Sequence, residues 1–201
     1  MFHRVTVRAS DREASERFYD TVLPTLGIEK GAWRDFVLEQ ADAERPVTRG
    51  LHIGFVAPSR AAVDEFWRAG TAAGYRDDGA PGPRPEYGDD YYGGFLLDPD
   101  GNSAEAVHHD GLRRGGVVDH LWIRVADVAA SKRFYEEVGP RAGFGLRTDT
   151  PGRAQFKGKS GSFSVLSGTP TENLEMAFVA SSAARLVDPD GNTVELVTSL
   201  A

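Results

Sequence analysis

The chain has 201 residues, 40% of them hydrophobic, and a formal net charge of −7. Nucleic acid is not an expected partner, because phosphate binding needs a basic surface and the basic residues here are scattered among acids. The absence of cysteine excludes disulfides, thiolate metal sites and thiol nucleophiles. No apolar stretch approaches the ~20 residues of a membrane span, and the N-terminus does not resemble a signal peptide. We therefore expect a soluble cytoplasmic protein without a membrane partner.

The sequence of the first half of the chain predicts strands, two helices and a hairpin. Residues 2–8 alternate between polar and apolar side chains, which is typical of a half-buried strand. A helix is expected to begin at Ser10 or Asp11 and to end before Pro24 and Gly27. The other expected elements of this half are short strands at 28–30, 33–40 and 51–57, a helix at 61–73, a long loop at 77–90, and a hairpin of residues 91–97 and 103–107 around the turn sequence DPDGN.

The second half follows a glycine-rich segment. Residues 111–116, with the sequence GLRRGG, form the best linker candidate. A strand at 118–125 and a helix at 128–138 come next, and further strands are expected near 154–156, 162–166 and 174–179.

Two stretches of the chain repeat each other. Residues 11–28 return at 127–144 with nine identical positions, and residues 96–107 return at 186–197 with the same DPDGN turn. Each copy combines a strand and a helix with a hairpin, so the repeat predicts tandem βαβββ modules. The expected fold is an α+β protein of two domains, residues 1–112 and 117–201.

The second copy is shorter than the first. Leu51 and Leu96 are 45 residues apart, whereas the matching residues Leu174 and Leu186 are 12 apart. The last module has therefore lost a helix and its adjoining loop, which leaves an apolar sheet face without a cover. We expect the first domain or another chain, as in a homodimer, to cover this face. Its residues are Leu174, Met176, Phe178, Val194 and Leu196.

The pattern resembles the vicinal oxygen chelate superfamily of glyoxalases, bleomycin resistance proteins and extradiol dioxygenases. The resemblance rests on the opening strand before D-x-x-A-S-x-R-F-Y, the strand at residues 51–55 and the two D-P-D-G-N-x-x-E hairpins. It implies that paired modules enclose a cleft, where His and Glu side chains hold a divalent ion. Such an ion chelates two adjacent oxygens of a small-molecule substrate and acts as a Lewis acid.

The resemblance implies two candidate ligand sets. In the first domain, His52 and Glu105 match the family's ligands and Glu39 lies near a third, but Arg4 stands where the opening histidine is expected. In the second domain, the matching residues are His120, Glu175 and Glu195. A third arrangement, in which the second and third modules pair, would gather His52, Glu105 and His120. The usual module order disfavours this arrangement.

Other polar residues are candidates for a substrate cleft. Arg8 and Arg124 occupy equivalent positions and could anchor a substrate or form an internal salt bridge. Arg4 could bind an anionic ligand or pair with a glutamate. At least one of Tyr87, Tyr91 and Tyr92 is expected in the cleft, whereas His108 and His109 are interpreted as a solvated strand end.

These residues support two functional hypotheses. The first is a metal-dependent lyase, isomerase or dioxygenase that uses Zn, Ni, Fe, Mn or Mg, with Glu105 as a proton shuttle. The second is a metal-free protein of the bleomycin-resistance type that sequesters a small molecule. Arg4 and the shortened second domain favour the second hypothesis, and the sequence leaves the substrate open.

Overall fold

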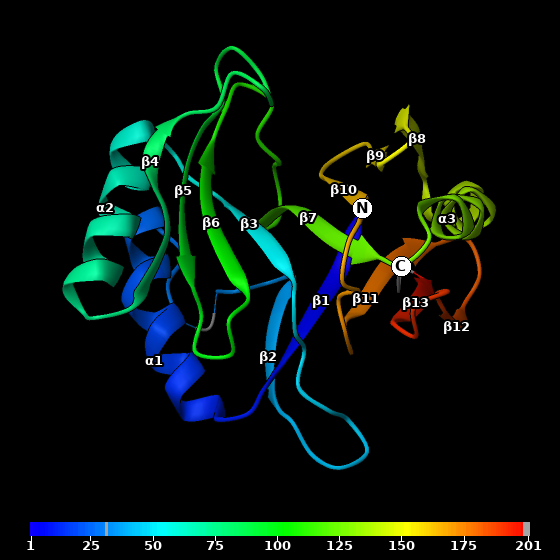
Figure 1. The fold of residues 1–201 in the computed structure, drawn as a ribbon, viewed down its shortest axis with the longest axis horizontal. Helices are drawn as coiled ribbons and strands as arrows, with labels where there is room; N and C mark the ends of the chain where they lie inside the picture. Colours follow the sequence, from blue (N-terminus) through cyan, green and yellow to red (C-terminus); the bar gives the residue numbers. More distant parts are fainter. Residues whose placement is uncertain (31, 199–201) are drawn as a thin grey trace.

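The computed structural model describes residues 1–30 and 32–198 and contains two mixed sheets with helices on their outer faces (Figure 1). In chain order the elements are β1 (Phe2–Ala9), α1 (Arg12–Val22), the 3-10 helix η1 (Leu23–Leu26), β2 (Phe36–Gln40), β3 (His52–Val56), α2 (Arg60–Ala72), β4 (Arg76–Pro83), β5 (Tyr92–Leu97), β6 (Ser103–His108), β7 (Val118–Val125), α3 (Val128–Ala142), β8 (Phe144–Thr150), β9 (Arg153–Gly158), β10 (Ser162–Ser167), β11 (Glu175–Ala180), β12 (Ala184–Val187) and β13 (Thr193–Thr198). The predicted α+β class is confirmed. None of the helices in the described residues combines the length and apolar character that a bilayer crossing requires.

The sheet order shows which modules pair. The larger sheet runs β4-β5-β6-β3-β7-β10-β9-β8, and the smaller runs β12-β13-β11-β1-β2. The larger sheet thus joins the second and third modules, while the smaller joins the first and the fourth. Pairing within each half of the chain, which the usual module order favoured, is wrong for this protein. Residues 111–116 connect two strands of the larger sheet, so the boundary expected there does not separate the two sheets.

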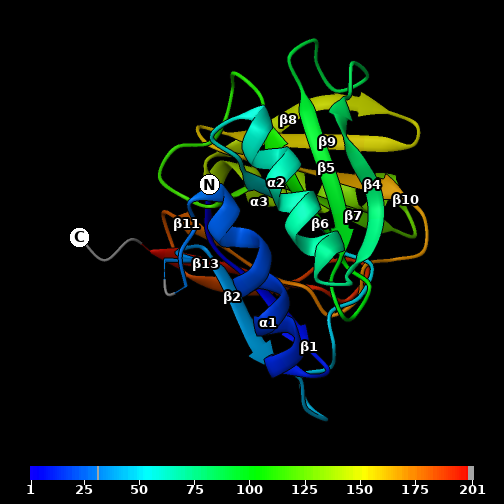
Figure 2. The same cartoon turned by 90° about the vertical axis from the view of Figure 1, so that its left-hand side faces the viewer.

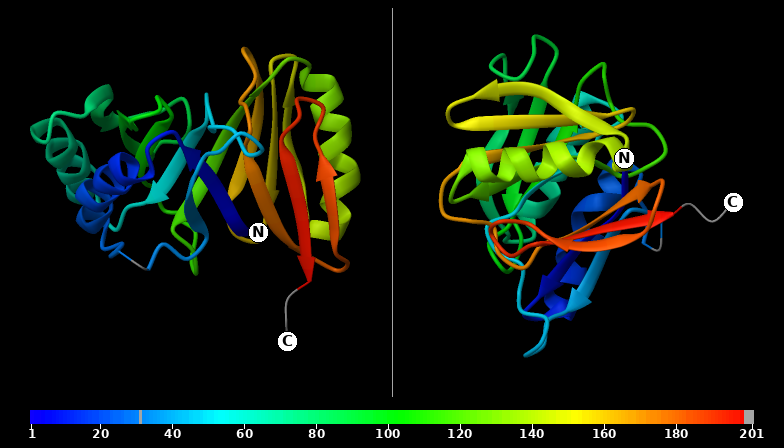
Figure 3. Two further views of the ribbon diagram at one scale, coloured as in Figure 1. Left: turned by 90° about the horizontal axis from the view of Figure 1, so that it is seen from below. Right: turned by 90° about the vertical axis from the view of Figure 1, so that its right-hand side faces the viewer.

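The helices cover the outer faces of both sheets. Helices α1 and α2 pack against each other, α1 on β1 and β2 and α2 on β4, β5 and β6 (Figure 2). Helix α3, yellow-green in Figure 3, packs on β8, β9 and β10 of the larger sheet and also on β11 of the smaller one.

The repeated sequence motifs are explained by hydrogen bonds that hold the modules together. Asp11 and Asp127 accept backbone N–H groups as the N-caps of α1 and α3. The tyrosine of each repeated Phe-Tyr pair is fully buried and donates to the first aspartate of a DPDGN turn: Tyr19 Oη lies 3.3 Å from Asp98 Oδ2, and Tyr135 Oη lies 3.0 Å from Asp188 Oδ2. The repeat therefore fixes a helix of one module to the turn of the next.

The asparagine of each turn fixes the register of the following strands. Asn102 Oδ1 accepts the Leu51 N–H at 3.1 Å, and Asn192 Oδ1 accepts the Leu174 N–H at 2.9 Å. These bonds hold the outgoing strand of each hairpin, β6 or β13, parallel to the strand that opens its module, β3 or β11. Glu105 and Glu195 each lie two residues after the first paired residue of their strand, Ser103 or Thr193. Side chains two residues apart on a strand share a face, and in both strands this is the inner face of the sheet.

The fourth module lacks the helix between β11 and β12, as predicted, but its apolar face is covered within the chain. Phe178 packs against Phe144 and Phe163 of the second half and against Phe2. Helix α3 also reaches β11, because no fourth helix intervenes. The first domain supplies part of the cover, as expected, through Phe2, while Phe144, Phe163 and helix α3 of the second half supply the rest. A buried face gives no reason to expect a homodimer through it. All five residues of the face are at most 2% exposed: Leu174, Met176, Phe178, Val194 and Leu196.

Two local expectations also differ from the structure. No strand forms at residues 28–30, where the chain leaves η1 through Gly27 in a left-handed conformation with φ 74°. The first half of the loop expected at 77–90 is strand β4, which pairs irregularly with β5. Residues 199–201 of the predicted second domain lie outside the described residues.

Candidate metal centre

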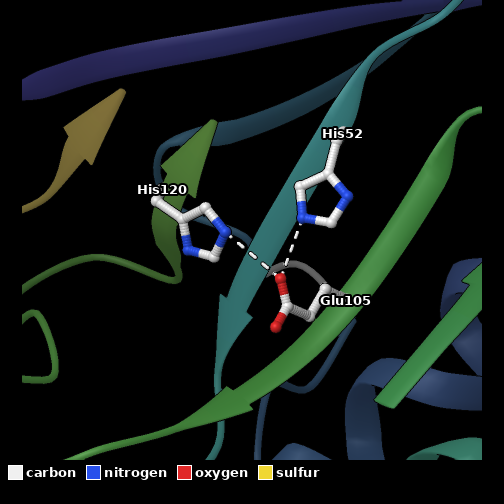
Figure 4. A group of neighbouring side chains, drawn as sticks. All are labelled: His52, Glu105 and His120. Atoms are coloured by element: carbon white, nitrogen blue, oxygen red, sulfur yellow. Dashed lines mark hydrogen bonds and ion pairs between the residues drawn. The ribbon is translucent and has the colours of Figure 1, made fainter. Parts of the chain in front are cut away.

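Three side chains from three neighbouring strands converge on the inner face of the larger sheet (Figure 4). His52 opens β3, Glu105 lies on β6 and His120 lies on β7. Glu105 Oε2 lies 2.8 Å from His52 Nε2 and 3.2 Å from His120 Nε2. The centre therefore forms through the pairing of the second and third modules, the arrangement that the module order disfavoured.

Two glycines make room for these side chains. Gly54 lies opposite both Glu105 and His120 in the strand register, and a Cβ at this position would collide with the His120 ring. A Cβ at Gly93 of β5 would collide with Glu105 Oε1. The glycines explain how a carboxylate and an imidazole fit at the centre of a sheet where both are almost fully buried.

A hydrogen-bond chain sets the tautomer of His52. The Ser103 hydroxyl donates to Asp78 Oδ2 at 2.6 Å, so its oxygen is available to accept from His52 Nδ1 at 3.1 Å. A proton on Nδ1 leaves the Nε2 lone pair of the neutral ring directed at Glu105. Carboxylate and hydroxyl partners of this kind orient histidines that bind metals.

A second series of hydrogen bonds sets the tautomer of His120. The Gly111 N–H donates to His109 Nδ1 at 3.1 Å, so Nε2 of His109 carries the proton that Asp119 Oδ2 accepts at 3.3 Å. The same Asp119 oxygen lies 3.1 Å from His120 Nδ1. His120 Nε2 is buried and has no hydrogen-bond partner within the described residues, which leaves it available as a ligand atom.

The carboxylate of Glu105 is ionised and held at both oxygens. It is 0% exposed, and its Oε1 accepts the Tyr91 hydroxyl at 2.7 Å. Burial alone would raise the pKa of Glu105, but the imidazoles of His120 and His52, 3.2 and 2.8 Å from its Oε2, lower it to about 2. Burial opposes protonation of His120, but Asp119 and Glu105 raise its pKa to about 10. Both shifts show that the site favours a positive charge between the three side chains, supplied by a proton or by a metal ion.

The residues fit a divalent ion. Ligand atoms about 2.1 Å from an ion, at angles of about 90 to 110°, are about 3 Å from one another. The separations from Glu105 Oε2 to the two Nε2 atoms, 2.8 and 3.2 Å, match this requirement, and all three ligand atoms lie within 4.8 Å of one another. Two imidazoles and one carboxylate form the donor set that suits non-haem Fe(II), and Mn(II) and Zn(II) accept it as well.

The strand register also identifies the residue of the third module that corresponds to Glu105. Glu105 lies opposite Gly54, two residues after His52, and the matching residue two after His120 is Trp122, which lies opposite Ser164 of β10. Ser164 is 1% exposed, and its hydroxyl accepts two hydrogen bonds from Arg153. The candidate centre thus offers three ligand side chains, and Ser164 takes the register position of Glu105 in the third module.

Two cavities open over the inner face of the larger sheet. A cavity of about 480 Å³ lies on the His120 side, and one of about 470 Å³ lies on the His52 side. Tyr87 and Trp122 line both cavities and touch edge to face, with ring centroids 5.0 Å apart. An aromatic contact therefore divides one cleft in two above the candidate metal centre.

The residues predicted to line a substrate cleft lie in three different places in the structure. Tyr87 lines both cavities and Arg124 lines the second. Tyr92 does not line either one; its hydroxyl lies 2.8 Å from Asp64 Oδ1 on α2, because successive residues of β5 point to opposite faces of the sheet. Tyr91, its neighbour, reaches Glu105 instead.

Arg4 and Arg8 lie on the smaller sheet with the remaining candidate ligands. Arg4 Nη2 lies 2.9 Å from Glu175 Oε1 and 2.8 Å from Glu195 Oε2. Burial would raise the pKa of Glu175, but hydrogen bonds from Arg4 and Arg8 hold it below its usual value.

Glu39, the last predicted ligand of this group, lies 3.5 Å from Arg8 Nε. In the described residues these glutamates do not join a converging group of His and acidic ligands, because arginines fill the space between them. The prediction that Arg4 stands at a ligand position of the metal site made from His52 is wrong. By register, Arg4 matches His120, while Glu175 and Glu195 match His52 and Glu105.

Sequence reasoning missed several residues that hold the centre. Asp119 precedes a ligand directly, and Ser103 lies two residues before Glu105, so both could have been found from their spacing. His109 was interpreted as solvated, yet it is half-buried, stacks on Tyr91 and supports Asp119. Its role depends on the loop that follows β6, which no local pattern reveals.

No protein-family model and no curated protein matches the chain. Solved structures do match. A glyoxalase/bleomycin resistance protein from Albidiferax ferrireducens has 34% identity over 54% of this chain and 99% of its own, with a TM-score of 0.48. Glyoxalase I from Zea mays matches 98% of this chain and 92% of its own at 15% identity and a TM-score of 0.66. A proposed dioxygenase from Bacillus subtilis matches 100% of this chain and 85% of its own at 10% identity, also at 0.66.

Proposed function

Because the chain is a member of the vicinal oxygen chelate superfamily by fold, we propose that it is a metal-dependent enzyme of the dioxygenase type. In this proposal His52, Glu105 and His120 hold one divalent ion, and the substrate is a small molecule with two vicinal oxygens. Fe(II) is the ion best suited to the donor set, with Mn(II) next.

The observation that carries the proposal is the convergence of three electron-pair donors. The hydrogen bonds of Ser103 and Asp119 direct both Nε2 lone pairs at an ionised carboxylate oxygen. The ionised carboxylate calls for a positive charge among the three donors, which a proton on an imidazole or a divalent ion would supply. Three protein ligands, with Ser164 in place of a fourth, favour a centre that leaves several coordination positions for substrate.

The metal ion would supply Lewis acidity to two bound oxygens and, as Fe(II), a site for O₂. The chain itself would orient the substrate and move its proton. Tyr87 and Trp122 would hold a flat substrate between aromatic faces and exclude water. Tyr91, whose hydroxyl donates to Glu105 Oε1, would carry a substrate proton to this carboxylate, which keeps Glu105 as the proposed proton acceptor.

The alternative hypothesis is metal-free sequestration of a small molecule. It rested on Arg4 in place of a histidine and on the shortened last module. Both features belong to the smaller sheet, away from His52, Glu105 and His120. They therefore do not weaken the case for a metal in the larger sheet, and the same experiment decides between the two hypotheses.

The test is metal content per chain after loading with Fe(II) under anaerobic conditions, or with Mn(II), Zn(II) or Ni(II), followed by desalting. We expect about one ion in the unaltered protein, and a loss in Glu105→Gln, His52→Ala and His120→Ala. Glu195→Gln is the matched control, because Glu195 occupies the equivalent position in the repeat and should leave the metal content unchanged.

Oxygen uptake by the Fe(II)-loaded protein with a panel of catechols then tests the reaction type. Isomerisation of 2-oxoaldehyde adducts by the Ni(II)- or Zn(II)-loaded protein, without oxygen uptake, would replace the dioxygenase proposal with a glyoxalase-type one. No retained metal under any loading would reject the enzyme proposal in both forms.

A further inference from the structure

One wall of the first cavity carries three positive charges without a carboxylate partner. Arg147 of β8 and Arg153 and Lys157 of β9 all line this cavity. In the part of the chain that the structure describes, none of the three forms an ion pair within 4.0 Å. The acidic residues of the cavity lie on other elements, with Glu86 and Asp90 in the loop before β5 and Asp119 on β7. The cavity is therefore polarised, positive on the side of β8 and β9.

Arg153 is the most firmly positioned of the three cations. Its Nε and Nη2 donate to Ser164 Oγ at 3.2 and 3.1 Å, and its guanidinium carbon lies 5.6 Å from the centroid of the Trp122 ring. These contacts fix the plane of the guanidinium and leave its Nη1 hydrogens without a partner among the described residues. A planar guanidinium held in this way is prepared to bind a carboxylate.

The position of Arg153 relates it to the metal centre. Ser164 is the register equivalent of Glu105, so Arg153 is bound to the residue that takes the place of Glu105 in the third module. The Trp122 ring, on which Arg153 lies, also has its centroid 6.0 Å from that of His120. A ligand that lies along Trp122 would therefore meet His120 at one end and Arg153 at the other.

On the inner face of the smaller sheet, the charges of the arginines are neutralised by glutamates. There, Arg4 and Arg8 each contact Glu175, and Arg4 also contacts Glu195. On the wall of the larger sheet, no glutamate or aspartate among the described residues fulfils this role for Arg153. The charge that is missing from the protein can be supplied by a bound ligand.

We infer that Arg153 binds a carboxylate of the ligand that occupies the first cavity. The inference rests on the proposed function and deepens it: the substrate class is a small organic acid whose carboxylate lies at Arg153 while its two vicinal oxygens reach the metal centre. Arg147 and Lys157 extend the positive wall, and Trp122 and Tyr87 favour a flat ring. Dihydroxybenzoates are acids of this kind.

The test compares acids with their uncharged amides by titration calorimetry on Mn(II)-loaded protein without oxygen. The probes are 3,4-dihydroxybenzoate with 3,4-dihydroxybenzamide, 2,3-dihydroxybenzoate with its amide, and lactate with lactamide. We expect at least one acid to bind about tenfold or more tightly than its amide, since a charge-assisted bidentate contact supports a difference of this size. In Arg153→Gln the preference should fall below about threefold.

Arg17→Gln, which removes the same charge from an exposed site on α1, should keep the full preference. Metal content and thermal melting of Arg153→Gln serve as checks that the variant is folded and still binds Mn(II). Equal affinity for every acid and its amide, including no binding of either, would overturn the inference, and so would a preference that persists in Arg153→Gln. If the unaltered protein retains no Mn(II), the proposed function fails, and the same titrations on metal-free protein still decide the role of Arg153.

Discussion

Gly54 and His120 face each other across the antiparallel pair of β3 and β7, and the imidazole occupies the space that a side chain at position 54 would fill. A Cβ built on Gly54 would lie 2.6 Å from His120 Nδ1. The ring is tied to Asp119 through this nitrogen, so it cannot move aside without losing that bond or displacing Nε2. The geometry of the proposed ligand thus depends on a residue that contacts no metal.

Gly54→Ala is therefore expected to weaken Mn(II) binding about tenfold or more while the fold is retained, because the displaced Nε2 no longer meets the other two ligands. Titration of metal-free protein with Mn(II), followed by electron paramagnetic resonance of the free ion, measures the change. Gly145→Ala is the matched control, since a Cβ at Gly145 would meet nothing within 4 Å. An unchanged affinity in Gly54→Ala would show that His120 is not held as described.

Tyr91→Phe tests the outer support of Glu105. The substitution removes the hydroxyl that donates to Oε1 at 2.7 Å and leaves a fully buried carboxylate oxygen without its partner. We expect metal affinity to fall about tenfold, within the range found for such supporting residues, with about one ion still bound at saturation. Tyr92→Phe, which loses only a contact with Asp64 on the outer face, should bind metal normally. Equal affinities in the two variants would remove Tyr91 from the site.

Local sequence patterns were sufficient for the modules but not for their pairing. The caps at Asp11 and Asp127 and the DPDGN turns act within or next to their own elements, so the motifs predict them directly. The pairing of the modules depends on which strand lies beside β3. The sequence does not decide this, because β7 and β1 have similar alternating patterns of polar and apolar residues. The burial of Glu105 between two histidines is decided by that pairing, through Gly54 and His120, which are 66 positions apart in the chain.

The two inner faces show why ligand positions alone could not locate the centre. Glu105 and Glu195 occupy equivalent places in the repeat, yet one lies between histidines and the other accepts from Arg4. The residue that meets each glutamate comes from another module: His120 of the third module meets Glu105, and Arg4 of the first module meets Glu195. On the smaller sheet Arg4 supplies a permanent positive charge to the glutamate, whereas the charge of the imidazoles beside Glu105 depends on protonation.

Arg4→Gln tests this structural role. The variant leaves Glu195 with Arg185 and Glu175 with Arg8, but it removes the guanidinium that bridges the two carboxylates. We expect a loss of about 1–2 kcal/mol in the free energy of unfolding and no change in metal content, because the cluster lies on the smaller sheet. Urea unfolding measures the first and elemental analysis the second. Metal binding that depends on Arg4 would contradict the assignment of the two faces.

Glu175 should make stability depend on acid pH. Arg4 and Arg8 hold its pKa below the usual value of 4.5, so the folded protein binds fewer protons than the unfolded chain in this range. The stabilisation is fully present above about pH 4.5 and is lost as pH falls through the lower, folded pKa.

Urea midpoints between about pH 6 and pH 3 should therefore fall more steeply for the unaltered protein than for Glu175→Gln, which does not titrate at this position. Glu172→Gln is the control, because the side chain of this neighbouring residue is exposed and takes no part in the cluster. Parallel pH profiles for the unaltered protein and Glu175→Gln would mean that the arginines do not stabilise the ionised form of Glu175. The cluster of Arg4, Arg8 and Glu175 would then be a solvated contact and not the internal counterpart of the metal centre.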